Sequence, residues 1–138
     1  IQKLNDMMYS QSMNIPENLQ YTTDHEWVLI DGNKAKVGIT DYAQDALGDV
    51  VFIDIPEIGK LVSVGETVTE VESTKSVSDI YAPLEGKIVE INSELDDGPE
   101  LLNGDPYGEG WIFVLEIDEA TSSNGLLSAT QYRELIEG

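Results

Sequence analysis

The chain has 138 residues, of which 41% are hydrophobic, so we expect one domain with a substantial core. Its 27 acidic and 7 basic side chains give a net charge of −20, which makes nucleic acid and anionic membranes poor partners and favours a soluble monomer. Cysteine is absent, which excludes disulfides, cysteine metal ligands and a cysteine nucleophile.

The N-terminal segment, residues 1–14, is neither rich in arginine nor built like a secretory signal. We interpret it as a flexible extension or as added residues, and we predict a single domain over residues 15–138. The longest apolar runs, at 50–53 and 111–115, have the length of strands and are too short to cross a membrane.

The predicted elements begin with a β-hairpin. Residues 26–30 and 34–39 are strand-like, and Asp31-Gly32-Asn33 between them is typical of a hairpin turn. The second strand alternates in the way expected of a strand with two different faces. One face carries Ala35, Val37 and Ile39, and the other carries Lys34, Lys36 and Gly38.

A short helix is predicted next. Thr40 or Asp41 can cap its start, it continues through Ala43 to Leu47, and Gly48 is placed to end it. The strand after it has three apolar markers on one face and two closing residues: Val51, Ile53 and Ile55, then Pro56 and Gly59.

The segment 65–91 is predicted to form a strand, a tip and a returning strand. The first arm is 67–72, and the second runs through 79–81 and on to 87–91. Pro83 and Gly86 are expected to bend the second arm. The tip between the arms is Ser73-Thr74-Lys75-Ser76, a group of small polar residues around one lysine.

The end of the chain is predicted to contain one more strand and a helix. Four apolar residues mark one face of the strand: Trp111, Phe113, Leu115 and Ile117. Ser128 and Gln131 have the spacing of a capping box. Leu127, Tyr132, Leu135 and Ile136 then recur at roughly helical spacing, which indicates an amphipathic helix lying on the sheet. The predicted fold class is therefore mostly β, with two small sheets, short helices and a C-terminal helix.

Lys75 is the candidate functional residue. A swinging-arm carrier needs a primary amine at an exposed turn, a rigid backbone under it and small neighbours, and Lys75 meets these conditions. An exposed lysine at a hairpin tip is also a common solubilising charge. Geometry by itself leaves both interpretations open.

The amino-acid sequence around Lys75 resembles the lipoylation segment of glycine cleavage H proteins. The similar residues are Glu72-Ser73-Thr74-Lys75-Ser76 and then 78–86. Further blocks in the same order are similar to the same family: His25-Glu26-Trp27, 37–45, 47–49, 102–111 and the closing segment 127–136. The resemblance covers about 18–136, nearly the whole domain.

The resemblance implies a lipoyl/biotinyl-type barrel-sandwich hybrid and a carrier role rather than an enzyme. It implies lipoate in amide linkage on Lys75, attached by a lipoate ligase or an octanoyltransferase. The arm would take an aminomethyl group from glycine decarboxylase, the pyridoxal-phosphate P protein, to the aminomethyltransferase, or T protein. Dihydrolipoyl dehydrogenase, the L protein, would reoxidise the dithiol. The expected compartment is the cytoplasm in a bacterium or the mitochondrial matrix in a eukaryote.

The resemblance also places Glu26 and Asp79 where the loaded arm is expected to dock. A carboxylate there could hold the aminomethyl ammonium, because a partly desolvated ion pair is stronger than one in water. The chain departs from the family at Thr74 and Ser76, which stand where valine and alanine are common. A third departure is Ala46, where some relatives carry histidine, so no role of that histidine is transferred.

The remaining candidates are weaker. We expect His25, the only histidine, to be positioned by packing near Trp27, and we expect no metal site and no catalytic constellation. Four alternatives stay open: a biotin carrier, a lipoyl domain of a 2-oxoacid dehydrogenase acyltransferase, an H-like protein that relays lipoate between lipoylation enzymes, and a non-carrier β module. Methionines usually flank the lysine of biotin carriers, and an aspartate usually precedes that of acyltransferase domains; neither is present here.

Overall fold

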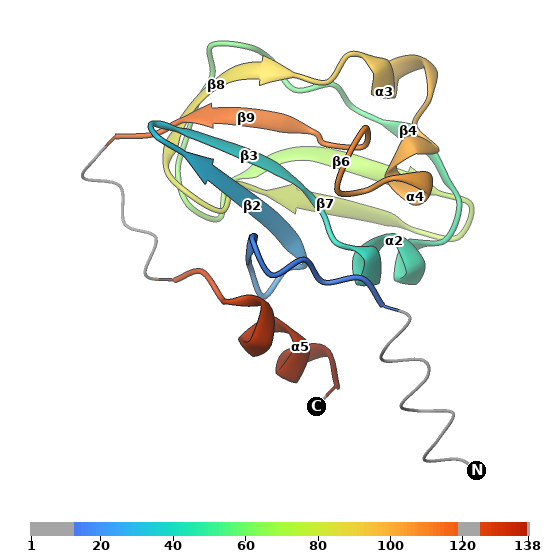
Figure 1. Ribbon diagram of the computed structural model, residues 1–138. Helices are drawn as coiled ribbons and strands as arrows, with labels where there is room; N and C mark the ends of the chain where they lie inside the picture. Colours follow the sequence, from blue (N-terminus) through green and yellow to red (C-terminus); the bar gives the residue numbers. More distant parts are fainter. Residues whose placement is uncertain (1–12, 119–124, 138) are drawn as a thin grey trace.

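The computed structural model describes residues 13–118 and 125–137, which form two antiparallel sheets and several short helices (Figure 1). One sheet has six strands in the order β1-β2-β3-β9-β8-β5, and the other has three in the order β4-β6-β7. The strands are β1 Gln20–Tyr21, β2 Glu26–Asp31, β3 Lys34–Ile39, β4 Val50–Ile53, β5 Leu61–Val62, β6 Thr67–Ser73, β7 Val77–Tyr81, β8 Gly86–Ile91 and β9 Phe113–Glu116. The helices are α2 Asp41–Leu47, α3 Glu94–Asp97, α4 Leu101–Gly104 and α5 Ala129–Glu137. None of them is long and apolar enough to cross a membrane.

The first hairpin forms as its sequence predicts. Strands β2 and β3 pair from Asp31 opposite Lys34 inward, and Gly32 in the turn has a φ of 62°, a conformation that glycine adopts without strain. The three predicted core residues of β3, Ala35, Val37 and Ile39, are at most 1% exposed. Both sheets contribute side chains to this core, which confirms the predicted mostly β class with two small sheets.

Strand β4 differs from its predicted alternation. Val51 was expected on the same face as Ile53, yet half of Val51 is exposed, whereas Val50 and Ile53 are buried. A register shift between Val50 and Phe52, opposite β6, is the cause: the extra residue of a bulge reverses the side-chain phase.

The late strand is also shorter than predicted. Strand β9 begins at Phe113, so Trp111 lies before it, and three consecutive residues of β9, Phe113 to Leu115, are buried. Alternation is lost because β9 lies between β3 and β8 in the middle of its sheet and is covered on both faces. Trp111 instead packs against a second cluster, and the ammonium of Lys36 lies 5.2 Å from its ring centroid.

This second cluster joins the first described residues to helix α5. Helix α5 begins with the predicted capping box, in which the Ser128 Oγ accepts from the Gln131 N–H and the Ser128 N–H donates to the Gln131 side chain. Its Tyr132 stacks on Tyr21 with 4.7 Å between ring centroids. Most of the predicted extension 1–14 lies outside the described residues, but Met13 is buried in this cluster.

Candidate functional site

Lys75 lies at the tip of the β6–β7 hairpin, as predicted, and its side chain is exposed. The turn is closed by the Ser73 N–H, which donates to the Ser76 carbonyl at 2.8 Å. The buried Ser73 Oγ accepts from the N–H groups of Lys75 at 3.3 Å and Ser76 at 3.1 Å. It also donates to the Ser76 carbonyl at 3.2 Å. The Ser73 hydroxyl thus stabilises the backbone beneath the lysine. Serine side chains commonly bond to nearby backbone groups in turns, so the sequence of the tip already indicates this role.

The tip rests on the corner between α2 and β4. The Thr74 N–H donates to the Asp49 carbonyl at 3.0 Å. Gly48 ends α2 with a φ of 80° and lies under the lysine stem: a Cβ at this position would approach the Lys75 Cε to 3.0 Å. The predicted capping of α2 is confirmed, since the Thr40 side chain accepts from the Ala43 N–H. Gly48 therefore ends the helix and, because it has no side chain, leaves room for the Lys75 side chain to pass over it.

Asn103, in α4, holds this corner in place. Its Oδ1 accepts from the Val50 N–H at 2.8 Å, and its Nδ2 donates to the Gly48 carbonyl at 2.9 Å and to the Gln44 Oε1 at 3.1 Å. The Asn103 amide therefore uses its acceptor and both of its donor hydrogens to hold the corner between α2 and β4, on which the Lys75 tip rests.

Replacing Asn103 by aspartate is expected to lower the free energy of unfolding by about 2–3 kcal/mol, because a carboxylate would face two acceptors where the amide donates. Urea denaturation of both proteins measures the loss. Asn33→Asp adds the same charge at an exposed turn and is the matched control, expected to stay within about 0.5 kcal/mol of the parent. Equal losses in the two variants would contradict the role assigned to Asn103.

A pocket of about 240 Å³ opens beside the tip, between α2 and β7. Ser76 and Leu47, the neighbours of Lys75 and Gly48, belong to its wall. The remaining lining residues come from the β1–β2 turn, the end of β3, α2 and β7: Asp24, His25, Ile39, Tyr42, Ala43, Ala46, Val77, Ser78, Asp79 and Ile80. Asp79, one of the two predicted docking residues, is therefore found here, and Asp24 contributes a second carboxylate that the sequence analysis missed.

Glu26, the other predicted docking residue, lies elsewhere. It is 1% exposed, and its carboxylate accepts from the Thr22 hydroxyl at 2.7 Å and from the Tyr81 N–H at 3.1 Å. It borders a different pocket of about 210 Å³, so the structure does not bring Glu26 and Asp79 into one cavity. Burial raises the pKa of Glu26 to about 7, although both hydrogen bonds act in the opposite direction.

His25 also differs from its expected surroundings. Its ring lies 4.7 Å from Tyr42 and 5.7 Å from Tyr132, centroid to centroid, and its Nδ1 is 2.8 Å from the Tyr132 hydroxyl. Its backbone has a φ of 71°, which is uncommon for a residue with a Cβ. Burial lowers the pKa of His25, opposed by the nearby Asp24. Trp27 instead covers Gly38 and donates its indole N–H to the Pro106 carbonyl.

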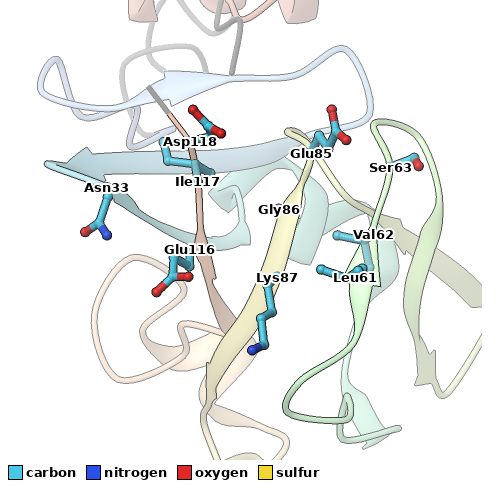
Figure 2. A pocket seen from close by; sticks show the side chains of 10 residues that line it. All are labelled: Asn33, Leu61, Val62, Ser63, Glu85, Gly86, Lys87, Glu116, Ile117 and Asp118. Atoms are coloured by element: carbon cyan, nitrogen blue, oxygen red, sulfur yellow. The ribbon is translucent and has the colours of Figure 1, made fainter. Parts of the chain in front are cut away.

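A larger cavity of about 560 Å³ has no part in this site (Figure 2). It lies where β5, β8 and β9 meet the turn that precedes β3, with Lys87 and Glu116 on its wall and Asn33 at its edge. None of the residues that line it belongs to the wall of the pocket beside Lys75. Within the described residues, no group of three or more metal-binding side chains is found.

Comparison with known proteins identifies the family. The family model described as "Glycine cleavage H-protein" matches residues 19–138. A glycine cleavage system H protein of Herpetosiphon aurantiacus is 56% identical over 123 residues, covering 89% of this chain and 94% of the relative. One of Thermus thermophilus is 54% identical over 125 residues, covering 91% and 98%.

The solved structures point the same way. The crystal structure of a glycine cleavage system H protein from Mycobacterium marinum superposes with a TM-score of 0.79 at 45% sequence identity, covering 87% of this chain and 97% of that one. The expected lipoyl-type barrel-sandwich fold is thereby confirmed. Given the match over residues 19–138 and relatives more than 50% identical, the chain belongs to the glycine cleavage H-protein family.

Proposed function

We propose that Lys75 carries a lipoyl group in amide linkage and that its tip is the working end of this glycine cleavage carrier. Membership of the family makes the chain a carrier component rather than an enzyme. The observation that supports Lys75 is its placement: an exposed primary amine on a turn that Ser73 braces from inside and that the α2–β4 corner supports from below.

The surroundings of Lys75 suit such a modification. Thr74 and Ser76 are small and exposed, so a lipoate ligase or an octanoyltransferase would meet no bulky side chain on either side. The lipoyl group supplies the dithiol that accepts the aminomethyl group and is later reoxidised, which is chemistry that a chain without cysteine lacks. The protein contributes the fixed attachment point and the cavity beside it.

The proposed resting place of the loaded arm is the pocket between α2 and β7. Asp24 and Asp79 line it, and carboxylates in a partly enclosed pocket attract an ammonium more strongly than they would in open water. Glu26 belongs to this proposal as a support, because its bond to the Tyr81 N–H ties the end of β7 to the β1–β2 turn. The arm would thus be held by Asp79 and only indirectly by Glu26.

Asp79→Asn is expected to speed hydrolysis of the aminomethyl-loaded arm about threefold to tenfold, because the ammonium loses about 1 kcal/mol of ion-pair energy near the surface. Release of free thiol from the loaded protein gives the rate. Glu70→Gln is the matched control: Glu70 pairs with Asp79 across the hairpin but is not part of the pocket wall. Hydrolysis unchanged in Asp79→Asn, or equally fast in both variants, would remove Asp79 from the site.

The proposed partners are the P, T and L proteins, and the proposed compartment is the bacterial cytoplasm, in keeping with the bacterial relatives. The test is glycine-dependent exchange of labelled carbon dioxide with a partner decarboxylase. We expect exchange with the lipoylated protein and none with Lys75→Arg. Absence of exchange from a fully lipoylated protein would favour a lipoate relay over glycine cleavage.

A further inference from the structure

Three side chains are linked by hydrogen bonds in a row that ends at the pocket between α2 and β7. The Thr40 Oγ1 is 2.8 Å from the Tyr132 hydroxyl, which is in turn 2.8 Å from the His25 Nδ1. Thr40 and Tyr132 are fully buried, and His25 forms part of the pocket wall. The proposed function uses neither Tyr132 nor His25.

The direction of each proton follows from the donors present. The Thr40 Oγ1 already accepts from the Ala43 N–H, and within the described residues its own proton has only the Tyr132 oxygen to go to. Burial raises the pKa of Tyr132 well above its usual value, so the phenol keeps its proton and donates it to the His25 Nδ1. Neutral His25 must then carry its proton on Nε2.

A histidine held in this state is a poor base at both nitrogens. Its Nδ1 lone pair is taken up by the Tyr132 proton, and its Nε2 already carries a hydrogen. Nε2 itself has no hydrogen-bond partner among the described residues. The other ionisable groups on the pocket wall are the carboxylates Asp24 and Asp79 and the phenol Tyr42. Aspartate carboxylates are weaker bases than imidazole by about two and a half pKa units in ordinary peptides.

Base strength matters because hydrolysis of an aminomethyl thioether begins with loss of a proton from its ammonium. The nitrogen lone pair then expels the sulfur, which keeps the electron pair of the C–S bond and takes up a proton. Water converts the freed one-carbon unit to formaldehyde, and nitrogen leaves as ammonium. An unblocked imidazole on the wall of the pocket could accept the first proton and so promote the loss of the cargo.

We propose that Tyr132 is a positioning residue that holds His25 in the Nε2–H form and thereby withholds a general base from the loaded arm. This inference rests on the proposed function, since it assumes that the arm enters the pocket between α2 and β7. It also assigns a role to helix α5 (Figure 1), which contributes Tyr132.

The first test needs no lipoyl group. Nitrogen-15 NMR of the unmodified protein distinguishes protonated from bare ring nitrogens, and His25 is the only histidine, so its signals are unambiguous. We expect a protonated Nε2 and a bare Nδ1 that accepts a hydrogen bond. In Tyr132→Phe the Nε2–H form should lose its support, so that a bare Nε2 signal appears for part of the His25 population. A wild-type protein with a protonated Nδ1 and a bare Nε2 would overturn the proposal even if every variant failed to fold.

The second test measures loss of the cargo. The lipoylated protein is reduced, loaded with formaldehyde and ammonium, and followed by the return of free thiol. Tyr132→Phe is expected to accelerate release roughly threefold to tenfold, below the range of a fully positioned general base. Tyr21→Phe removes a buried hydroxyl from the ring that stacks on Tyr132 without touching His25, and it should leave the rate unchanged.

A double variant shows whether His25 carries the effect. Asparagine tolerates the left-handed backbone of His25, so His25→Asn preserves the turn while removing the imidazole. Tyr132→Phe should no longer accelerate release in the His25→Asn background. An acceleration that persists there would mean that the pocket has merely loosened, and it would overturn the proposal. Failure to find a lipoyl adduct by intact mass would instead count against the proposed function, and the NMR result would stand apart from it.

Discussion

Replacing Lys75 by arginine is expected to abolish the lipoyl adduct completely. Arginine keeps the positive charge and much of the length of lysine, but its guanidinium stays protonated and offers no amine for an amide bond. Intact-mass measurement of protein from a host supplied with lipoate should show one adduct on the parent and none on Lys75→Arg. Because the side chain is exposed at the hairpin tip, the fold should be unaffected.

Lys87→Arg is the matched control for this experiment. Lys87 is also exposed, but it lies on β8 at the wall of the larger cavity and not at a hairpin tip (Figure 2). Its replacement should leave the adduct at full yield. An adduct that survives Lys75→Arg, or a Lys75 left unmodified by a competent ligase, would refute the carrier site.

The free energy of unfolding of the parent is expected to fall as pH rises, and Glu26→Gln is expected to remove about 3 kcal/mol of that fall. The folded-state pKa of Glu26 is raised from 4.5 to about 7, mainly because burial disfavours the carboxylate. Below pH 4.5 the carboxyl is protonated in both the folded and the unfolded chain. Between pH 4.5 and about 7 this carboxyl ionises only in the unfolded chain, so the free energy of unfolding falls as pH rises. The whole shift of the Glu26 pKa corresponds to about 3 kcal/mol.

Urea denaturation at pH 5 and pH 8 measures this effect. The parent should lose about 2.5 kcal/mol more than Glu26→Gln over that interval, because glutamine cannot ionise and a small part of the effect already precedes pH 5. All other acidic groups are common to both proteins, so their contributions cancel in the comparison. Glu57→Gln, at an exposed position, should follow the parent. The same pH dependence in Glu26→Gln as in the parent would show that Glu26 is not the responsible group.

The elements predicted from sequence are those whose determinants lie close together in the chain. The β2–β3 hairpin depends on the turn at Gly32 and the alternation after it, and α2 depends on Thr40 at one end and Gly48 at the other. The position of Lys75 at a tip follows from two strand-like arms that flank three small residues and the lysine itself. In each case the interactions that decide the conformation span a few residues, so a local pattern contains them.

The working details of the site required the tertiary structure, because their partners are distant in sequence. Asn103 holds Val50 across 53 positions, Glu26 accepts from Tyr81 across 55, and His25 meets Tyr132 across 107. No periodicity or spacing can show which buried polar groups will pair when the chain closes on itself. The chain by itself thus determined a mostly β carrier fold with Lys75 exposed at a tip. Only tertiary packing decided that Asp79 lines the pocket between α2 and β7, that Glu26 accepts from the end of β7, and that the Tyr132 hydroxyl lies 2.8 Å from the His25 Nδ1.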